Sequence, residues 1–444
     1  MPRRKYKKKL KFWVVTVDMG YGHQRAAYPL KHLAYQGIIN ANTYTGIPAT
    51  DRKIWQEQRK FYETISRFKS FPLIGDAIFK LYDRFQRIPK FYPKRDLSKP
   101  NFQVLAATRL IKDKHWGRHL IKKLAKKPLP LVTPFFATAI MAEVNNYPNE
   151  IYCVICDADI SRSWVAAEPK QSRIKYFAPC DRVVERLKLY GVLESRIFLT
   201  GFPLPLKNLG SRSLGIAKFD LRHRLINLDP QRNYINKYKD TLHASLKIKN
   251  FPKKADHPLT LTFAVGGAGA QRELGIQIVK GLIKQIENRK IRVNLIAGVN
   301  RQVSHYFRQS IIKIGLQKQL HKEVRILYTP NKEEYLEKFN EWIRKTDILW
   351  TKPSELSFYC ALGLPIIMAP PIGSQEDFNQ KFLISLGAGI LQNDLRYVSQ
   401  WLFDWINNGR LAEAAAQGFL EAPQDGVYNI EKIILKNLDK FKSF

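Results

Sequence analysis

Cysteine is scarce in the 444-residue sequence, which has only Cys153, Cys156, Cys180 and Cys360. The first two form a C-x-x-C pair, but they lie in the strand-like run Ile151–Asp157 and no second pair completes a zinc site. We therefore expect reduced cysteines in and beside core strands rather than metal or redox chemistry. Such cysteine usage favours a cytoplasmic location.

Long apolar runs are also lacking. No stretch of about 18 uninterrupted apolar residues occurs, so we expect no segment that spans a bilayer. The apolar run Phe12–Val17 is too short for a signal peptide and ends at Asp18, and it is interpreted as the first core strand. The protein is expected to be soluble, or peripheral on the cytoplasmic face of a membrane.

Acidic residues are few: 38 Asp and Glu stand against 74 Lys and Arg, for a net charge of +36. Residues 1–130 hold 30 of the basic and 8 of the acidic residues, so this part alone carries +22. A field of this sign attracts polyanions, and two remain open as partners: nucleic acid and an anionic membrane surface.

Apolar segments alternate between strand-like and helical spacing along both halves of the chain. In the first half, strands are predicted at Lys11–Asp18, Leu129–Thr133, Ile151–Asp157, Lys175–Ala178 and Ile197–Thr200, and helices at Gly22–Gln36 and Asp181–Tyr190. In the second half, strands are predicted at Leu259–Val265, Arg292–Ala297, Val324–Tyr328, Asp347–Thr351 and Pro365–Ala369, with helices at Glu273–Glu287, Arg301–Ile314, Lys332–Arg344 and Glu355–Leu362. This rhythm predicts an α/β fold of two Rossmann-like domains facing across a cleft.

The predicted organisation has five parts. They are a basic tail at 1–10, an N-terminal Rossmann-like domain at 11–205, a linker or insertion at 206–258, a C-terminal Rossmann-like domain at 259–395, and C-terminal helices at 396–444.

The first loop suited to chemistry is Asp18–His23, between the first strand and its helix. Gly20 and Gly22 allow a tight turn and a close approach of a ligand, and the helix N-terminus offers N–H groups to an anion. His23 falls at the carboxyl edge of the sheet, where ligands of open α/β sheets bind. A histidine that only hydrogen-bonds the start of the helix is the alternative.

The second loop, Val265–Gln271, follows the first strand of the second half. Gly266, Gly267 and Gly269, with Ala268 between them, leave backbone N–H groups open to phosphates. The loop matches neither the Walker pattern nor G-x-G-x-x-G. A strand-to-helix turn that simply needs small residues is the alternative.

The third segment runs from Thr351 to Asn379. Ser354 and Glu355 open a predicted helix, and Gln375, Glu376 and Asn379 follow the next strand. Their carboxylate and amide groups are suited to ribose or sugar hydroxyls. For Ser354 the alternative is helix capping, and for Glu376 it is surface solvation.

The order and spacing of these loops resemble the GT-B glycosyltransferases that include monogalactosyl- and diglucosyl-diacylglycerol synthases, and more distantly the peptidoglycan enzyme that adds GlcNAc to a lipid-linked precursor. The resemblance covers residues 11–395. It is carried by D-x-G-x-G-H at Asp18, Gly20, Gly22 and His23, by Cys156-Asp157 with Trp164, by Arg186–Val192 with Thr200–Pro203, by Gly363–Pro365, and by Gln375, Glu376 and Asn379.

The resemblance implies an inverting transfer of a hexose from a nucleotide-sugar, expected to be a UDP-sugar, without an obligatory metal or a cofactor. The acceptor would be a membrane lipid, diacylglycerol-like or polyprenyl-linked, bound by the N-terminal domain. His23 is the expected base, and Asp157 is expected to orient His23 or the acceptor, or to be structural. The expected donor-binding residues are Gly266, Gly267, Ala268, Gly269, Ser354, Glu355, Gln375, Glu376 and Asn379. Ala268 and Pro353 depart from the family pattern, which leaves the donor unidentified.

Aromatic and basic residues alternate over residues 53–95, as expected of a segment at a lipid interface. Ordinary helix packing with solvated charges is the alternative. Two other functions stay open: a nucleic-acid-binding protein on a GT-B scaffold, since single strands also bind basic and aromatic surfaces, and an epimerase or a transferase with a soluble acceptor.

Overall fold

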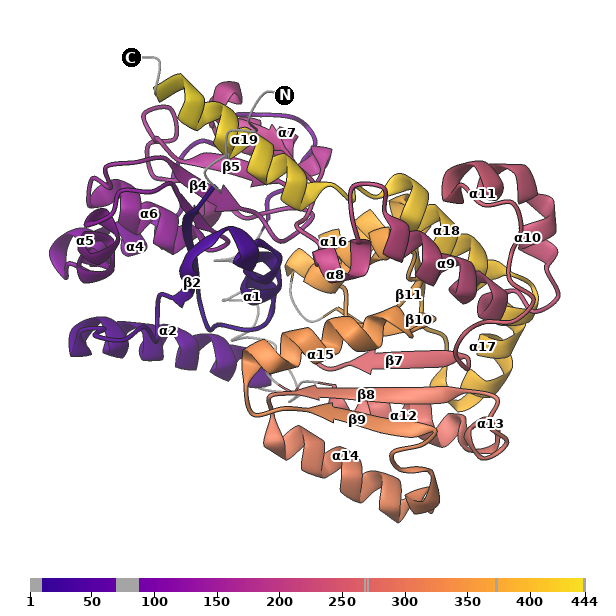
Figure 1. Cartoon of the computed structure of the whole chain (residues 1–444). Helices are drawn as coiled ribbons and strands as arrows, with labels where there is room; N and C mark the ends of the chain where they lie inside the picture. The colour runs from indigo at the N-terminus through magenta and orange to yellow at the C-terminus, as the bar shows by residue number, and fades with distance from the viewer. Residues whose placement is uncertain (1–9, 69–87, 267–268, 270, 372–373, 442–444) are drawn as a thin grey trace, which may run out of the picture. The chain divides into compact units, whose positions relative to one another are not determined.

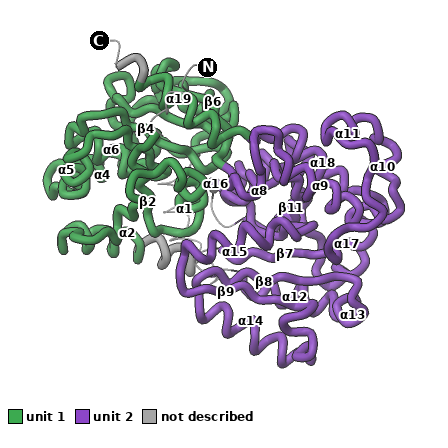
Figure 2. Tube along the Cα trace, viewed as in Figure 1, with its two compact units in different colours: residues 1–62, 84–203, 425–444 green, residues 63–83, 204–424 purple. Residues whose placement is uncertain are grey.

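The computed structural model of the chain describes residues 10–68, 88–266, 269, 271–371 and 374–441. The predicted basic tail, much of the aromatic and basic segment at 53–95, and Gly267 and Ala268 of the second loop therefore lie wholly or largely outside the described residues. The chain divides into two compact units, unit 1 (Met1–Tyr62, Arg84–Pro203 and Asp425–Phe444) and unit 2 (Glu63–Asp83 and Leu204–Gln424), coloured separately in Figure 2.

Unit 1 is built on one sheet of six parallel strands in the order β2-β1-β3-β4-β5-β6 (Figure 1). The strands are β1 (Phe12–Thr16), β2 (Ala34–Asn40), β3 (Leu131–Thr133), β4 (Ile151–Val154), β5 (Lys175–Ala178) and β6 (Ile197–Leu199). All side chains of β1, β3 and β4 are buried, as expected for strands covered on both faces. The prediction of a parallel sheet in the first half is confirmed.

The helix predicted over Gly22–Gln36 is wrong beyond its first turns. The α-helix α1 (Gly22–Ala27) passes into a 3₁₀ helix, η1 (Tyr28–Leu33), and the chain then forms β2. Pro29 occupies the first turn of η1, and its missing N–H cannot continue an α-helical hydrogen-bond ladder. Ala34, the last of the apolar residues that suggested a longer helix, instead begins this edge strand.

The remaining helices of unit 1 surround this sheet. They are α2 (Ala49–Phe68, which continues into unit 2), α4 (Phe102–Asp113), α5 (Arg118–Ala125), α6 (Phe136–Val144), η2 (Arg162–Trp164), α7 (Asp181–Leu189), η3 (Glu194–Arg196) and α19 (Gly426–Phe441).

Unit 2 contains the second sheet, also of six parallel strands, in the order β12-β11-β10-β7-β8-β9. The strands are β7 (Thr260–Ala264), β8 (Arg292–Gly298), β9 (Val324–Tyr328), β10 (Ile348–Thr351), β11 (Ile366–Met368) and β12 (Gly389–Leu391). This is the strand order 3-2-1-4-5-6 of a dinucleotide-binding Rossmann fold. The second predicted Rossmann-like half is thus confirmed, although sequence reasoning missed the edge strand β12.

The helices that begin within unit 2 complete the fold. They are α8 (Leu206–Leu209), α9 (Gly215–Leu228), α10 (Asn233–Lys237), α11 (Lys239–Leu246), α12 (Arg272–Gly281), α13 (Ile283–Glu287), α14 (Arg301–Lys313), η4 (Gln317–Gln319), α15 (Lys332–Arg344), η5 (Glu355–Leu362), α16 (Ser374–Ser385), η6 (Leu395–Tyr397), α17 (Val398–Asn407) and α18 (Arg410–Glu421). Within the described part of the chain, no helix is long and apolar enough to cross a membrane.

The C-terminal helices do not form one segment. Helices α17 and α18 belong to unit 2, whereas α19 belongs to unit 1. Val427, Ile430 and Ile434 follow helical spacing on α19 and are buried. At its start, a Cβ on Gly426 would lie 2.2 Å from the carbonyl oxygen of Phe202, so the backbones approach too closely for a larger residue.

Residues 206–258, predicted as a linker and insertion, pack within unit 2 through an arginine. The guanidinium of Arg224 on α9 is 1% exposed and donates hydrogen bonds to the carbonyls of Thr346, Leu362 and Gly363 at 2.7–2.9 Å. These carbonyls lie at the ends of α15 and η5, so one side chain satisfies acceptors that helix ends leave open. The segment is therefore part of the body of unit 2.

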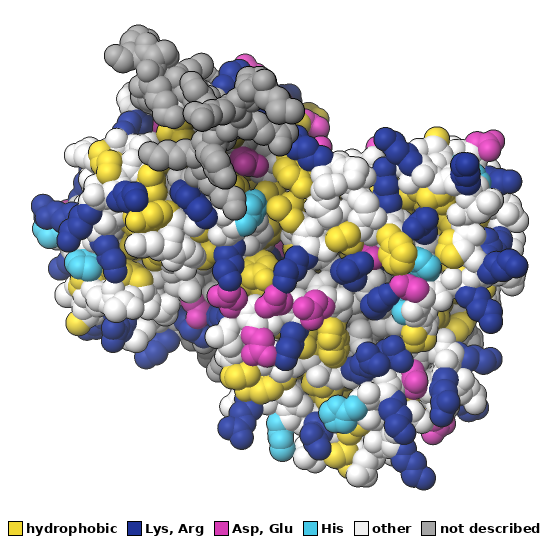
Figure 3. All heavy atoms as spheres, in the orientation of Figure 1, with side chains coloured by type: hydrophobic (Ala, Val, Ile, Leu, Met, Phe, Trp, Pro, Cys, Tyr) yellow, Lys and Arg dark blue, Asp and Glu magenta, His cyan; other side chains and the backbone are white. Residues whose placement is uncertain are grey.

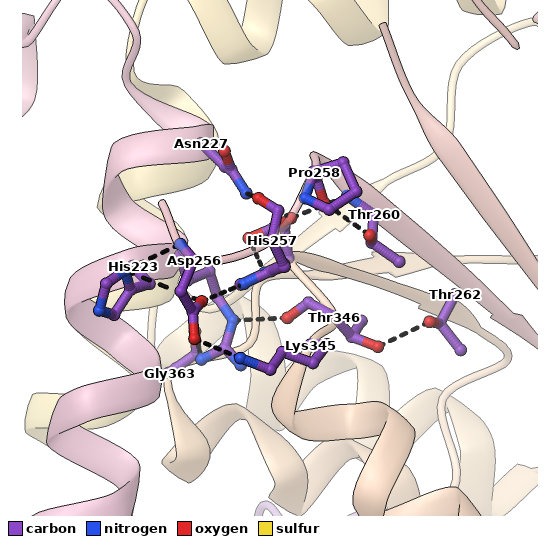
Figure 4. Close-up of polar contacts among 12 residues, drawn as sticks. His223, Asn227, Asp256, His257, Pro258, Thr260, Thr262, Lys345, Thr346 and Gly363 are labelled. Atoms are coloured by element: carbon purple, nitrogen blue, oxygen red, sulfur yellow. Dashed lines mark hydrogen bonds and ion pairs between the residues drawn. The ribbon is translucent and has the colours of Figure 1, made fainter. Parts of the chain in front are cut away.

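A polar cluster lies at the amino edge of the second sheet (Figure 4). Asp347, fully buried just before β10, accepts hydrogen bonds from the Thr260 backbone N–H at 2.7 Å, from Asn227 Nδ2 at 3.0 Å and from His257 Nε2 at 3.1 Å. His257 Nδ1 lies 2.6 Å from Asp256 Oδ1, and Asp256 also pairs with Lys345. The cluster ties residues 256–260 to the starts of β7 and β10.

Both ring nitrogens of His257 face carboxylates, so both act as donors and the imidazole carries a positive charge. Burial alone would lower the pKa of His257, but the hydrogen bonds and charges of Asp347 and Asp256 outweigh it and raise the pKa above 6.5. Burial likewise opposes ionisation of Asp256, yet its contacts with Lys345 and His257 lower its pKa to about 2. Both shifts favour the charged forms of His257 and Asp256.

Replacing His257→Gln should lower the free energy of unfolding by about 1–3 kcal/mol, because the buried Asp347 loses a charged donor. Since the folded pKa of His257 is raised, its contribution is complete below pH 6.5 and fades as pH rises through the folded value. Thermal midpoints of both proteins across a pH series should therefore converge toward alkaline pH. His305→Gln, at an exposed position on α14, is the control. A gap that widened with rising pH would contradict this assignment.

Candidate functional site

Both halves place their candidate loops where the strand order reverses. In unit 1, β1 lies between β2 and β3, so the loops after β1 and β3 leave the sheet in different directions. In unit 2 the same reversal occurs between β7 and β10, where Ala264 pairs with Thr351. Ligands of open α/β sheets bind at such switch points, beyond the carboxyl ends of the strands. The topology therefore supports a site in each unit.

The loop after β1 is held in a fixed shape by Asn42. Its side chain accepts a hydrogen bond from the Asp18 N–H at 2.9 Å and donates to the Asp18 carbonyl at 3.2 Å. Gly20 has a φ of 90°, a conformation that a residue with a side chain rarely adopts. The loop thus delivers the chain to α1, where Gly22 is the first residue and His23 the second. Sequence reasoning missed Asn42 because it follows β2, the unrecognised strand.

The ring of His23 has a defined orientation. Its Nδ1 lies 2.8 Å from the carbonyl oxygen of Pro134, just after β3, and 3.6 Å from the sulfur of Cys156. A carbonyl oxygen only accepts hydrogen bonds, so Nδ1 carries the hydrogen of the neutral ring. The lone pair then belongs to Nε2, which is the form required of a base that acts through this nitrogen.

Aromatic side chains surround His23. The ring of Phe135 meets it edge to face with centroids 4.9 Å apart, and the ring of Trp164 lies 6.2 Å away. Phe136 bridges them, with centroid distances of 4.8 Å to Phe135 and 5.7 Å to Trp164. These apolar rings keep water from much of the imidazole, which favours proton transfer to a bound partner over exchange with solvent.

Asp157 lies half-buried beyond the carboxyl end of β4, next to Cys156. The orienting contact at Nδ1 of His23 comes from Pro134, so the predicted positioning role of Asp157 stays a prediction. Asp159, two residues later, has a structural role: it is fully buried and pairs with Arg186 and Arg182 at 2.8 Å. Arg186, part of the motif in the predicted resemblance, therefore stabilises the fold of unit 1.

In unit 2 the loop after β7 has two described glycines, Gly266 and Gly269, and neighbouring side chains pack closely against both. A Cβ on Gly266 would lie 2.9 Å from Cε of Lys352, and one on Gly269 would lie 2.9 Å from Cγ2 of Val303. Gly269 has a φ of 74° and donates its N–H to the Gly266 carbonyl at 2.8 Å. The loop turns tightly into α12, whose first N–H groups have no acceptor within the helix.

Three loops meet beside this turn. Lys352 directly follows β10 and forms an ion pair with Glu376 on α16, and its side chain packs against Gly266. Gln271 at the end of the glycine loop donates to the Pro370 carbonyl after β11 at 2.9 Å. The structure therefore joins the second predicted loop to the third segment.

Lys352 is the residue of this site that sequence reasoning did not assign. The sequence feature that could have identified Lys352 is its position: it is a single charged residue directly after a fully buried strand, at a sheet edge expected to bind anions. Its ammonium group adds a positive charge beside the glycine loop, where phosphate binding was predicted.

The predicted polar residues of α16 differ in exposure. Glu376 is 7% exposed and Asn379 is fully buried, and their i,i+3 spacing places them on one face of the helix. Gln375 is half-buried. Surface solvation, the alternative for Glu376, is therefore wrong, and contacts of these side chains with a sugar or ribose stay a prediction.

The helix predicted to open at Ser354 is a 3₁₀ helix, η5, rather than an α-helix. The side chain of Ser354 makes no capping hydrogen bond, so the capping alternative is not realised, and Glu355 is half-buried in the first turn. Gly363 ends η5 in the left-handed region, and a Cβ there would lie 2.8 Å from Leu221. The end of η5 therefore packs closely against α9, which carries Leu221.

All four cysteines are free and buried. Burial raises the pKa of the Cys180 and Cys360 thiols to about 12, which makes both poor nucleophiles. Over the residues that the structure describes, no group of three or more His, Cys, Asp and Glu side chains could hold a metal ion.

Two curated relatives that are similar to this chain in sequence have the same name. The chain is 22% identical over 397 residues to a processive diacylglycerol beta-glucosyltransferase of Bacillus licheniformis, covering 86% of this chain and 82% of that protein. It is 21% identical over 437 residues to the protein of the same name from Bacillus cytotoxicus, covering 96% and 94%. A family model described as a domain of unknown function, DUF6938, matches residues 243–435.

Two solved structures are similar over most of the chain. A Staphylococcus aureus MnaA–UDP structure has a TM-score of 0.48 at 12% identity, covering 95% of each chain. Acinetobacter baumannii MurG has a TM-score of 0.44 at 13% identity, covering 96% of this chain and 99% of that one. The relatives of related sequence confirm the predicted resemblance: the chain is similar to diacylglycerol glucosyltransferases, and it has the two parallel sheets that were predicted.

The hydrogen bond to Pro134 predicts which nitrogen of His23 is protonated in the neutral ring. ¹⁵N NMR of the imidazole groups should show hydrogen on Nδ1 and none on Nε2, with the signal assigned by its loss in His23→Gln. The reason is that Nδ1 lies 2.8 Å from the Pro134 carbonyl oxygen, which can only accept a hydrogen bond. Hydrogen found on Nε2 would show that this nitrogen cannot serve as the base.

Proposed function

We propose that the chain transfers a hexose from a nucleotide-sugar, a UDP-sugar, to a lipid acceptor at a membrane surface, with inversion at the anomeric carbon. The observation that carries the proposal is His23: its Nε2 holds the lone pair, its ring is fixed by Pro134, and it lies at the switch point of the first sheet. The resemblance to diacylglycerol glucosyltransferases supports the lipid acceptor.

The reaction assigns one task to each unit. In unit 1, Nε2 of His23 takes the proton of the acceptor hydroxyl while the hydroxyl oxygen attacks the anomeric carbon. The bond between that carbon and the diphosphate oxygen breaks, and the nucleoside diphosphate leaves with both electrons of the bond. Attack from the face opposite the leaving group inverts the anomeric centre.

In unit 2, positive groups stabilise the departing diphosphate. The N-terminus of α12 supplies a dipole, and Lys352 supplies a full charge beside the glycine loop. Glu355 and Glu376 are assigned to accept hydrogen bonds from ribose or sugar hydroxyls in this proposal. When the diphosphate binds, Lys352 can exchange its Glu376 partner for a phosphate oxygen, so the ion pair holds the cation ready for the donor.

The surface supports attachment to an anionic membrane. Lys and Arg side chains are spread widely over the face drawn in Figure 3. In unit 1, Tyr92 and Phe102 are each 69% exposed, and Lys90, Lys94 and Arg95 lie near Tyr92 in the chain. Aromatic rings at the headgroup boundary and cations on acidic lipids bind such a surface together.

UDP should raise the thermal midpoint of the purified protein, because a ligand of the native state adds about 2.7 kcal/mol at one hundred times its Kd. Lys352→Met should weaken UDP binding about 10- to 100-fold through the loss of a charge-assisted hydrogen bond. Lys381→Met removes the same charge from an exposed position on α16 and should leave binding unchanged. Glu355→Ala and Glu376→Ala should also weaken UDP binding.

If no common nucleotide shifted the midpoint at millimolar concentration, the donor site would be refuted. If Lys352→Met bound UDP as tightly as the wild type, Lys352 would not belong to the donor site, and the rest of the site would stand.

His23→Ala should lower the rate of sugar transfer by about 10²- to 10⁴-fold, the usual contribution of a general base. Its UDP-induced thermal shift should persist, because the base acts on the acceptor and not on the donor. The control is His32→Ala on η1, an exposed histidine whose Nδ1 contacts the Pro29 carbonyl at 3.0 Å. Transfer by His23→Ala at the wild-type rate would show that another group is the base.

A further inference from the structure

Gln271 joins the glycine loop of unit 2 to helix α12 in a backbone conformation that few residues with a side chain adopt. It directly precedes α12, with a φ of 64° and a ψ of 20°, in the left-handed region. The residue before a helix is ordinarily extended. Gly269, two residues earlier, shares this region at a φ of 74° without strain, because glycine has no Cβ. Gln271 therefore holds a strained turn in which a glycine would be unstrained.

The side chain of Gln271 is bonded to another loop. It makes no capping hydrogen bond with α12, and its Nε2 instead donates to the carbonyl oxygen of Pro370 at 2.9 Å. Pro370 lies two residues beyond the end of β11, whereas Gln271 follows β7, and β10 lies between these two strands in the sheet. The amide thus connects two loops across the end of an intervening strand.

This arrangement suits an anion at the start of α12 in two ways. Because the side chain is bonded to Pro370, it does not occupy the N–H groups of the first helical turn, as a capping serine or aspartate would. The turn at Gln271 also sets the direction in which α12 leaves the loop, and so the point that its N-terminal dipole faces. The same loop packs against Lys352 through Gly266. Gln271 therefore shapes the start of the helix in the loop beside that lysine.

We propose that Gln271 is a positioning residue for the donor diphosphate. Its hydrogen bond to Pro370 holds the strained turn, and the turn aims the N-terminus of α12 at the phosphate oxygens, while the side chain itself does not touch the donor. A glycine would reach the same backbone conformation without this bond, since it has no strain to offset. The role rests on the donor site of the proposed function and adds to it the residue that fixes its shape.

Calorimetric titration of UDP into full-length variants tests this role. Gln271→Met keeps the length of the side chain but removes the donor, so the turn relaxes and UDP binding should weaken about 3- to 10-fold, the usual contribution of one hydrogen bond. Gln271→Gly also lacks the amide but adopts the left-handed turn without strain, so its UDP affinity should stay within about twofold of the wild type. Gln277→Met, at an exposed position of α12, is the control and should bind as the wild type does.

Two results would overturn the role of Gln271 and leave the donor site intact. One is wild-type affinity in Gln271→Met. The other is a loss in Gln271→Gly as large as that in Gln271→Met, which would indicate that the side chain contacts the donor directly. If the wild type itself did not bind UDP, the donor site of the proposed function would be refuted, and the role of Gln271 with it. Thermal midpoints without UDP verify folding, and Gln271→Leu, which also lacks the amide, replaces Gln271→Met if that variant is unstable.

Discussion

The reversal of strand order in each parallel sheet is the constraint on which both candidate sites depend. Where neighbouring strands send their connections to opposite faces, their carboxyl ends leave a space that no connection covers. In unit 1 this brings the carbonyl of Pro134, after β3, to the ring of His23, after β1. In unit 2 it brings Lys352, after β10, to Gly266, after β7. In both, a residue of one loop fixes a residue of the other.

The two edges of the second sheet have different tasks. At the carboxyl edge lie glycines, polar side chains of α16 and Lys352, which pairs with Glu376. At the amino edge, Asp347, His257 and Asp256 satisfy one another and the starts of β7 and β10. This ionic cluster thus lies at the edge opposite the one where ligands of open α/β sheets bind.

Much of the fold could be predicted from the sequence, because buried parallel strands are runs of apolar residues. Strands β5 and β9 and helix α15 have the predicted bounds, and both Rossmann-like halves were predicted. The edge strands β2 and β12 were missed: Ala34–Asn40 is only partly buried and lacks a continuous apolar run, and β12 has only three residues. Asn42 was consequently overlooked as a loop residue.

The candidate loops were predicted as well, but the contacts between them were not. The group that orients His23 is a backbone carbonyl, which any residue possesses, so no side chain in the sequence could identify it. The pairing of Lys352 with Glu376 joins residues from two loops of a motif whose spacing alone does not reveal contact. These contacts between loops become visible only in the folded structure, where the strands of the sheet lie side by side.

The return of α19 to unit 1 has a consequence for the order of events during synthesis. Asn429 donates to the carbonyl of Thr200 at 2.9 Å and Asn437 to the hydroxyl of Tyr152 at 2.9 Å, so the last helix completes a unit whose sheet was translated long before. Domains generally fold as they leave the ribosome, from the N-terminus onward. Here unit 1 must wait, partly uncovered, until unit 2 and α19 have been made.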